Sequence, residues 1–380
     1  MSSTVKRLEV TYNPVNDSNT FTSGDVITGQ VTLEVLKDCE IDSLYIKFKG
    51  KAEVLWTERY GQTTVVYHSK DKYFSFKQYF IRDANLKGDE NAPDTTQILE
   101  TYPSVVAPGI HVYPFSFQIP SQEMPSSFKA DTGKIVYLLE TGLSRSMRVT
   151  KKESTKINFA SKADINCVSG LMTPQHESKD KKMKLFTSGS VAMEVDLEKS
   201  GFFQGEGLKV LAFIKNDSSR EIKPKYCLYR KHSFFAQGRR RVHTKDLLKE
   251  VGAPIPPSAA EKVTQIITIP HDVEPSIHNC NIIKAEHRLR VYLDVKYASD
   301  PEIKFEIVIL PASQASLVES APPTTAAGFG FEPFGNPNPP VWGFGPPQPP
   351  AGPQSSDQPP PPYGAYAMYP PMYEYDNKYH

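Results

Sequence analysis

The sequence predicts an all-β protein in which two tandem β-sandwich domains precede a disordered tail rich in proline and tyrosine. Three observations support this prediction. Apolar and polar residues alternate over most of the chain, two long segments resemble each other in order, and the composition changes sharply near the end. We expect a first domain at 5–167, a linker at 168–186, a second domain at 187–312 and a tail at 313–380.

The alternation has a period of two, which is typical of antiparallel strands with one buried face. Turn clusters such as NPVNDSN and KNDSSR separate the runs. Helical patterns are scarce; HTKDLLKEVG at 243–252 is the best candidate for a short helix, and LETYP at 99–103 is weaker. The residues expected to face the core are Val31, Leu33, Val35, Leu44, Ile46 and Phe48 in the first domain, and Val191, Met193, Val195, Leu197, Leu289, Val291, Leu293, Val295, Tyr297, Ile303, Phe305, Ile307 and Ile309 in the second.

Two pairs of segments indicate an internal duplication. IPSQEMPSSF begins at Ile119 and IPHDVEPSIHN at Ile269, and each precedes an alternating strand. Upstream, FTSGDVITGQVTLEV at Phe21 resembles FFQGEGLKVLAFIKN at Phe202. Chance is the alternative, because the shared Ile-Pro-x4-Pro-Ser pattern is short. Between the copies, the polar segment at 169–189 has no strand period, and its KDKKMK run is expected to be a solvated linker.

Composition limits the compartment and the partners. The chain has 380 residues, with 44 Lys+Arg against 43 Asp+Glu, so no bulk field favours nucleic acid and we expect no such partner. The start lacks the apolar run of a secretory signal, and no stretch is long enough to span a bilayer, which favours a cytoplasmic protein. The four cysteines, Cys39, Cys167, Cys227 and Cys280, lie far apart and are expected to be buried, reduced thiols.

No motif indicates catalysis. The chain has no G-x-S-x-G elbow, no phosphate-binding G-x-x-x-x-G-K-[ST] loop and no H-E-x-x-H pair, so we expect neither an enzyme nor a cofactor. His271, His278, Cys280 and His287 are the nearest approach to a metal cluster. Their spacing fits no tetrahedral template, and we expect no metal.

A basic segment, RKHSFFAQGRRRVHTK, resembles two strands joined at a hairpin tip, Ala-Gln-Gly-Arg. Its residues Arg239, Arg240 and Arg241 are candidates for contact with phosphate groups or lipid headgroups, because guanidinium groups pair bidentately with phosphate. The alternative is a solvated hairpin whose charges protect an edge strand from pairing.

The tail carries two P-P-x-Y motifs, the ligand of WW domains. Proline keeps the chain extended before docking, so little backbone entropy is lost, and the tyrosine reaches a separate pocket. An SH3 ligand is the rival interpretation, but it normally needs a flanking Arg or Lys. A chance match is another alternative, as is a sorting or SH2 signal at Tyr369, and Pro339-Pro340-Val341-Trp342 is a degenerate third copy. The predicted WW-binding residues are Pro360, Pro361, Tyr363, Pro370, Pro371 and Tyr373.

The segments FTSGDVITGQVTLEV, PGIHVYPFSFQIPSQEMPSSF, FIKNDSSREIKPKYCLY and PSIHNCNII resemble the α-arrestins, the arrestin domain-containing proteins. The resemblance covers residues 5–312 and extends to the tail. It implies two arrestin-type, Ig-like sandwiches and a trafficking adaptor that binds cytoplasmic regions of membrane receptors or transporters. Such an adaptor recruits WW-domain HECT-type E3 ubiquitin ligases and associates peripherally with plasma membrane and endosomes or lysosomes through its cargo.

Two further expectations depend on that resemblance. One branch of the α-arrestins binds thioredoxin through a cysteine in the second domain, and the matching stretch here, IPPSAAEKVTQ at 255–265, has none. We therefore expect that activity to be lacking. The main alternative to the ligase adaptor is a structural endosomal coat subunit of retromer type, whose assembly would not depend on the tail.

Overall fold

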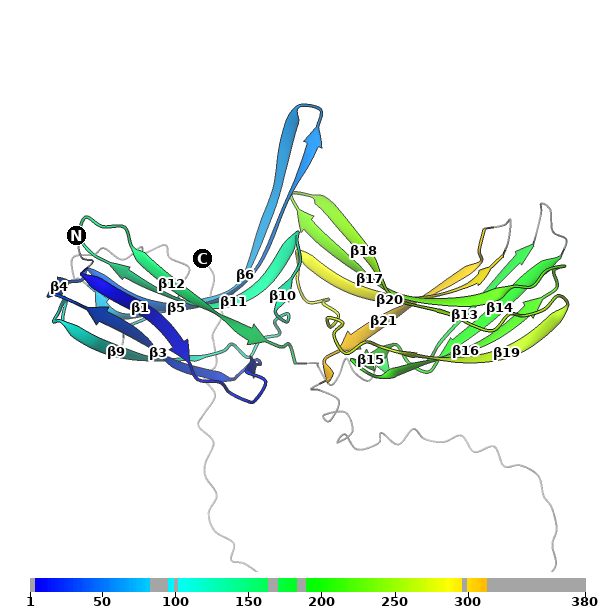
Figure 1. The fold of residues 1–380 in the computed structure, drawn as a ribbon, viewed down its shortest axis with the longest axis horizontal. Coiled ribbons are helices and arrows are strands. Elements are labelled where there is room, and N and C mark those ends of the chain that lie inside the picture. Colours follow the sequence, from blue (N-terminus) through cyan, green and yellow to red (C-terminus); the bar gives the residue numbers. More distant parts are fainter. Residues whose placement is uncertain are drawn as a thin grey trace, which may run out of the picture. The chain divides into compact units, whose positions relative to one another are not determined.

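The computed structural model describes residues 4–82, 95–98, 102–162, 170–182, 189–295 and 299–312. Both P-P-x-Y motifs and the whole predicted tail lie outside these residues, as do Cys167 and Tyr297. The described chain forms two β-sandwiches, each made of two facing sheets (Figure 1). The predicted all-β fold with two tandem sandwiches is confirmed.

The first sandwich joins a three-stranded sheet to a larger one. The small sheet has the order β1-β3-β9, formed by β1 (Val5–Tyr12), β3 (Val26–Val35) and β9 (Gly109–Gln118). The large sheet has the order β2-β12-β11-β5-β6-β7, with β2 (Thr20–Phe21), β12 (Lys151–Phe159), β11 (Gly133–Ser144), β5 (Ser43–Tyr60), β6 (Thr63–Arg82) and β7 (Thr95–Ile98); β10 (Phe128–Lys129) pairs with β11. A short ladder joins β4 (Cys39–Glu40) to β8 (Val105–Val106).

The second sandwich repeats this plan. One sheet has the order β13-β14-β16-β19, from β13 (Gln175–Lys182), β14 (Ser190–Leu197), β16 (Gly207–Asn216) and β19 (Ala259–Thr268). The facing sheet has the order β15-β21-β20-β17-β18, from β15 (Gly201–Phe203), β21 (Glu302–Leu310), β20 (Ile283–Asp294), β17 (Lys223–Ala236) and β18 (Arg239–Val251).

The period of two correctly predicted which side chains enter the cores. Every predicted inward residue that the structure describes is buried, from Val31 in β3 to Ile309 in β21. In β14 the buried residues alternate with partly or fully exposed ones over the whole strand. This pattern arises because successive side chains of a strand point to opposite faces, and only one face of each sheet contacts the other sheet.

Matching hydrogen bonds confirm the internal duplication. In the first copy the N–H of Gly24 donates to Ile119 O (3.2 Å), and in the second the N–H of Gly205 donates to Ile269 O (3.0 Å). Both glycines adopt positive φ, 86° and 83°, which glycine tolerates best. Ser127 and Ser276 occupy equivalent positions in the two copies. The N–H of Ser127 donates to Phe159 O, and the N–H of Ser276 donates to Ile309 O. The serine match is thus shifted by one residue from the Pro-Ser alignment in the sequence.

The predicted helix at 243–252 is wrong, because these residues form most of β18. A β-bulge explains the misleading pattern: Leu228 pairs with Leu248 and the next residue, Tyr229, with Asp246, which leaves Leu247 as an extra residue. Two adjacent leucines therefore both pack partly against the core, which resembles a helical face in the sequence. The weaker candidate at 99–103 falls mostly outside the described residues.

The predicted linker is wrong for 175–182, which form β13. This strand pairs with β14 from Gln175↔Leu197 to Lys182↔Ser190 and makes an edge of its sheet. Most of its residues are exposed, so neither face needed apolar side chains and no alternation marked it in the sequence.

Candidate functional site

The outer face of the large sheet in the first sandwich carries a row of basic residues. Along β5 the side chains of Phe48, Ala52 and Val54 are buried, so the intervening residues point outward. Glu53 lies opposite Lys134 of β11 on one side and Lys70 of β6 on the other. We call this region the lysine face; its outward members are Lys49, Lys51, Glu53, His68, Lys70, Lys134 and Glu140.

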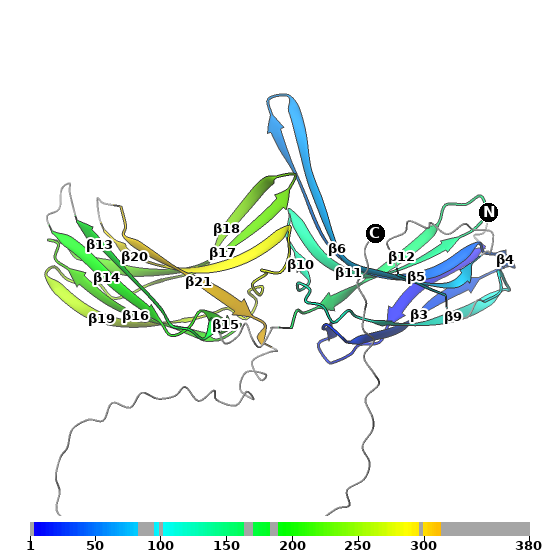
Figure 2. The same ribbon diagram turned by 180° about the vertical axis from the view of Figure 1, so that it is seen from behind.

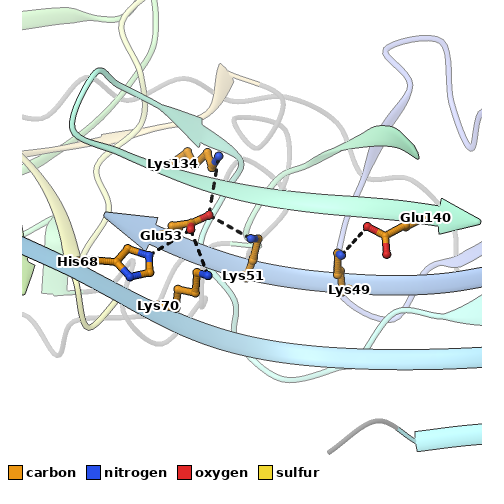
Figure 3. A network of polar contacts seen from close by, with 7 residues as sticks. All are labelled: Lys49, Lys51, Glu53, His68, Lys70, Lys134 and Glu140. Atoms are coloured by element: carbon orange, nitrogen blue, oxygen red, sulfur yellow. Dashed lines mark hydrogen bonds and ion pairs between the residues drawn. The ribbon is translucent and has the colours of Figure 1, made fainter. Parts of the chain in front are cut away.

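Glu53 is the centre of the lysine face (Figure 3). Its oxygens lie 3.0 Å from Lys51 Nζ, 3.2 Å from His68 Nε2, 3.4 Å from Lys70 Nζ and 3.8 Å from Lys134 Nζ. Partial burial opposes ionisation, but the hydrogen bonds from Lys51 and His68 outweigh it and lower the pKa of Glu53 to about 2. A single carboxylate thus faces three ammonium groups, and the region keeps an excess of positive charge.

A hollow of about 560 Å³ adjoins the lysine face. Its described lining holds four lysines and no carboxylate. Tyr12, Phe128 and Tyr137 give it apolar walls. Clefts with charges of one sign attract ligands of the opposite sign, so this surface suits an acidic or phosphorylated segment. The lysines are Lys51, Lys129, Lys134 and Lys156.

The β17–β18 hairpin places the three arginines that the sequence singled out. Its tip is the predicted one: β17 ends at Ala236, β18 begins at Arg239, and Gln237 and Gly238 both adopt positive φ, 51° and 72°. Two successive residues of this kind form the tight turn that fits the twist of a hairpin. The hairpin prediction is confirmed, and β18 is an edge strand of its sheet.

The three arginines have different surroundings. Arg239 is exposed. Arg240 donates to Ser233 Oγ at 2.8 Å and lies 3.8 Å from Glu286, which also pairs with Lys231 and Arg288. Arg241 donates to the Thr57 carbonyl in the other sandwich at 3.5 Å. Contact of these arginines with phosphate or lipid stays a prediction.

A cavity of about 470 Å³ is lined by residues of both sandwiches. On one wall Glu274 accepts hydrogen bonds from Arg230 (2.8 Å) and His232 (2.5 Å). Burial opposes ionisation of Glu274, but the bond from His232 and the charge of Arg230 lower its pKa to about 2. His232 also meets the ring of Phe128 edge-on, with centroids 5.1 Å apart. The polar groups of Arg230, His232 and Glu274 are thus hydrogen-bonded to one another on this wall of the cavity.

The cysteines and the His/Cys group that came nearest to a metal cluster in the sequence have separate surroundings in the structure. Cys39, Cys227 and Cys280 are buried free thiols, as predicted. Cys280 accepts a hydrogen bond from Tyr73 at 3.3 Å, and His287 is fully buried beside Ser276. Within the described ranges no three His, Cys, Asp or Glu residues gather closely enough to hold a metal ion. In the same part of the chain, no helix has the length and apolar character of a membrane span.

Sequence reasoning missed the lysine face. The alternation Lys47, Lys49, Lys51 within LYIKFKGKAEV is visible in the sequence and indicates basic residues on one strand face. What the sequence does not reveal is that Lys70 and Lys134 join them across two neighbouring strands. The WW-binding residues lie outside the described part of the chain and stay predictions.

Comparisons with known proteins agree with the fold. The family described as "Arrestin (or S-antigen), N-terminal domain" matches residues 8–166, and "Arrestin (or S-antigen), C-terminal domain" matches 187–314. Arrestin domain-containing protein 4 is 26% identical over 292 residues in both Mus musculus and Homo sapiens, covering 76% of this chain and 68% of each relative. Thioredoxin-interacting protein of Rattus norvegicus is 24% identical over 308 residues, 80% of this chain and 74% of the relative. Both domain matches fall in order on the two sandwiches, so the chain belongs to the arrestin family, among the adaptor-type arrestin domain-containing proteins or α-arrestins.

Proposed function

We propose that this chain is a non-enzymatic trafficking adaptor. Its arrestin domains bind cytoplasmic regions of membrane receptors or transporters, and its P-P-x-Y motifs recruit WW-domain HECT-type E3 ubiquitin ligases. The cargo is then ubiquitinated and enters endocytosis or endosomal sorting, at the plasma membrane and on endosomes or lysosomes. One observation carries the proposal: two P-P-x-Y motifs follow a tandem pair of arrestin domains in a single chain.

The ligase half depends on the chemistry of the tail. Between Ser313 and the end of the chain there is no arginine and Lys378 is the only lysine, which disfavours SH3 ligands that need a flanking cation. The two motifs start ten residues apart, a span of at most about 31 Å if the chain between them is all polyproline II. Neighbouring WW domains of one ligase can therefore bind both motifs, which raises the apparent affinity through effective concentration.

The cargo half has support from the lysine face. Three ammonium groups around Glu53, and a hollow with four lysines, favour a partner segment that carries carboxylates or phosphates. We do not extend to this chain the interaction that names the thioredoxin-interacting proteins. Residues 255–265 contain no cysteine, and Cys227 and Cys280 are both fully buried.

The tail is tested by changing Tyr363 and Tyr373 to Ala together in the full chain. We expect capture of WW-domain ligases to fall at least about tenfold, since each motif loses the side chain that enters the tyrosine pocket. Tyr366→Ala with Tyr375→Ala is the matched control, because it removes two tail tyrosines outside the motifs. Undiminished capture by the first variant would refute ligase recruitment through these motifs.

Deleting residues 313–380 separates the adaptor from the alternative of a retromer-type scaffold. An adaptor without its tail still binds cargo but no longer brings a ligase to it. A structural coat subunit would keep its endosomal assembly and its effect on cargo. Proximity labelling with the intact and the shortened chain distinguishes these results, because ligase contacts and cargo contacts are counted in one comparison.

A further inference from the structure

The loop between β11 and β12 in the first sandwich exposes two apolar side chains completely. Met147 has a relative exposure of 103% and Val149 of 96%, the highest values among the exposed large apolar residues of the described chain. Exposed apolar side chains are common singly, and exposure alone indicates nothing about function. The surroundings of these two residues are what make the loop informative.

The loop holds Met147 in an unfavourable conformation. The N–H of Arg148 donates to Arg145 O at 3.1 Å, which closes a tight turn with Met147 as its third residue. Met147 has φ of 56°, in the left-handed region where glycine or asparagine is preferred at that position. The turn thus presents a large apolar side chain at its tip, although a smaller polar residue would fold there more easily. Strained residues of this kind tend to mark functional sites.

Basic residues alternate with the apolar ones. The segment 145–152 reads RSMRVTKK and has no Asp or Glu. Arg148 and Lys152 are exposed, and Arg145 and Lys151 are partly exposed. The local charge is strongly positive, although the whole chain carries a formal net charge of only +1.

Other exposed apolar residues lie at the same end of the first sandwich. Hydrogen bonds tie this end together: Asp42 N–H donates to Ser144 O, and Cys39 pairs with Val106 in the β4–β8 ladder. The figures place β4 at one end of the sandwich in both views (Figure 1 and Figure 2). The exposed residues near it are Leu36 (47%), Val105 (59%) and Ile110 (66%).

We propose that the β11–β12 loop docks directly on an anionic lipid bilayer, with Met147 and Val149 in the headgroup boundary and Arg145, Arg148, Lys151 and Lys152 at the lipid phosphates. Apolar side chains beside cations form the usual interfacial anchor, and basic residues near an anionic surface add to the binding. This contact goes beyond the proposed function, in which the membrane is reached through cargo.

A bilayer fits this loop better than a peptide ligand does. Peptide recognition needs a sheet edge or a groove whose walls surround the anchoring side chain. Met147 and Val149 have no such walls, because both are essentially fully exposed. A bilayer supplies the apolar surroundings itself and needs only a projecting tip.

The test is co-sedimentation of the purified full chain with vesicles, without cargo or ligase. Vesicles of phosphatidylcholine alone are compared with vesicles that also contain phosphatidylserine. We expect binding to the mixed vesicles, little binding to the neutral ones, and loss of binding at high salt because the charges are exposed.

Two variants separate the apolar and the basic contributions. Met147→Asn with Val149→Ser removes the apolar tip, and asparagine tolerates positive φ, so the turn is preserved. We expect the partition constant to fall about tenfold for this variant. Arg148→Gln with Lys152→Gln is expected to lower it about 25-fold, since each cation contributes roughly fivefold.

Two control variants make the same kinds of substitution outside the β11–β12 loop. Leu211→Ser with Ile266→Ser removes apolar residues that are 42% and 61% exposed on the second sandwich. Arg239→Gln with Arg241→Gln removes cations from the β17–β18 hairpin, which is the rival site for lipid contact that the sequence suggested. Both controls are expected to bind vesicles as the unchanged chain does, and thermal unfolding of all four variants checks that each is folded.

Vesicle binding that is absent in the unchanged chain, or unaltered by both loop variants, would overturn the proposal. So would loss of binding only in the arginine control, which would assign the contact to the β17–β18 hairpin. If the loop variants instead weakened binding of an acidic peptide and left vesicle binding unchanged, the loop would be a protein contact and the proposal would be wrong. Ligase capture through Tyr363 and Tyr373 is measured separately, so failure of one idea leaves the other standing.

Discussion

The two sandwiches share a backbone plan but differ in the side chains on it. Equivalent hydrogen bonds join Gly24 to Ile119 and Gly205 to Ile269, and equivalent serines bind the last strands of both copies. Ile135 pairs with Phe128 in the first copy as Ala285 pairs with Ile277 in the second, so these two pairs are equivalent. Two residues further along the strand, however, the first copy has Tyr137 and the second has His287. The hydrogen bonds that close the turns are shared by both copies, whereas side chains diverged even at this buried position.

The outer faces of the larger sheets illustrate this divergence. Each has one carboxylate ringed by cations, Glu53 among lysines and a histidine, and Glu286 among Lys231, Arg240 and Arg288. In the part of the chain that the structure describes, the first copy adds a lysine-lined hollow and the second adds an edge strand, β13, beside the shared plan. Comparing the copies thus separates residues that maintain the scaffold from residues available for binding.

The largest predicted difference between the copies is a response to pH at His287. The imidazole is fully buried, its Nε2 has no hydrogen-bond partner among the described residues, and burial lowers its pKa to about 4 from an ordinary 6.5. A depressed folded-state pKa means that the unfolded chain binds the proton more tightly. The contribution of neutral His287 to the free energy of unfolding is therefore complete above pH 6.5. It is lost as the pH falls through 4, which lowers the free energy of unfolding by about 3 kcal/mol.

Hydrogen exchange measured separately for each sandwich tests this. Protection of β20 should fall between pH 6.5 and 4, while protection of β11, which carries Tyr137, should change little after correction for intrinsic exchange. His287→Phe should remove the difference between the strands. Equal pH dependence in both copies would show that His287 is not its source.

The matched glycines predict a smaller difference. Gly24→Ala should cost about 1 kcal/mol, because its positive φ disfavours any Cβ, although the nearest atom, Ser121 Oγ, would lie at an ordinary contact distance of 3.8 Å. Gly205→Ala should cost about 1 kcal/mol more, because its Cβ would lie 2.1 Å from the His271 ring and force that side chain out of position. Adding His271→Ala should make the two costs equal, as measured by denaturant unfolding. Equal costs without that change would contradict the account.

Removing the hydroxyl group of Tyr137 tests the other member of the divergent pair. Tyr137 donates to Pro125 O at 2.6 Å within the buried core. Tyr137→Phe should destabilise the first sandwich by about 1 kcal/mol, since the carbonyl loses its buried donor. Exchange in the second sandwich is the internal control and should not change. A loss of protection in both copies would mean that the sandwiches do not open separately.

The smallest effect is expected at the ringed carboxylates. The pKa of Glu53 is lowered to about 2, so its contribution is present above about 4.5 and is lost as the pH falls through 2. Glu53→Gln should cost less than about 1 kcal/mol at neutral pH, because most of its partners are solvated. The free energies of unfolding of the Glu53→Gln variant and of the unchanged chain should become equal near pH 2, where Glu53 is protonated. Glu286→Gln is the matched change in the second copy.

Much of the fold was predictable from sequence, because burial on one face leaves a visible period of two, as at Val191 to Leu197. The prediction failed where that cause was missing. Leu247 and Leu248 share a side only because of a bulge, and the exposed strand β13 has no apolar face. The Glu53 network was also hidden, since its cations come from three strands that only the folded register brings together.

The adaptor role is tested most directly by reconstituted ubiquitin transfer to a membrane-protein cargo, with a WW-domain HECT-type ligase and the full chain. The account predicts transfer with the intact chain and with the Tyr366→Ala, Tyr375→Ala control. It predicts transfer near the level without adaptor for Tyr363→Ala with Tyr373→Ala, although that variant still binds cargo. Undiminished transfer with the latter variant would contradict the account.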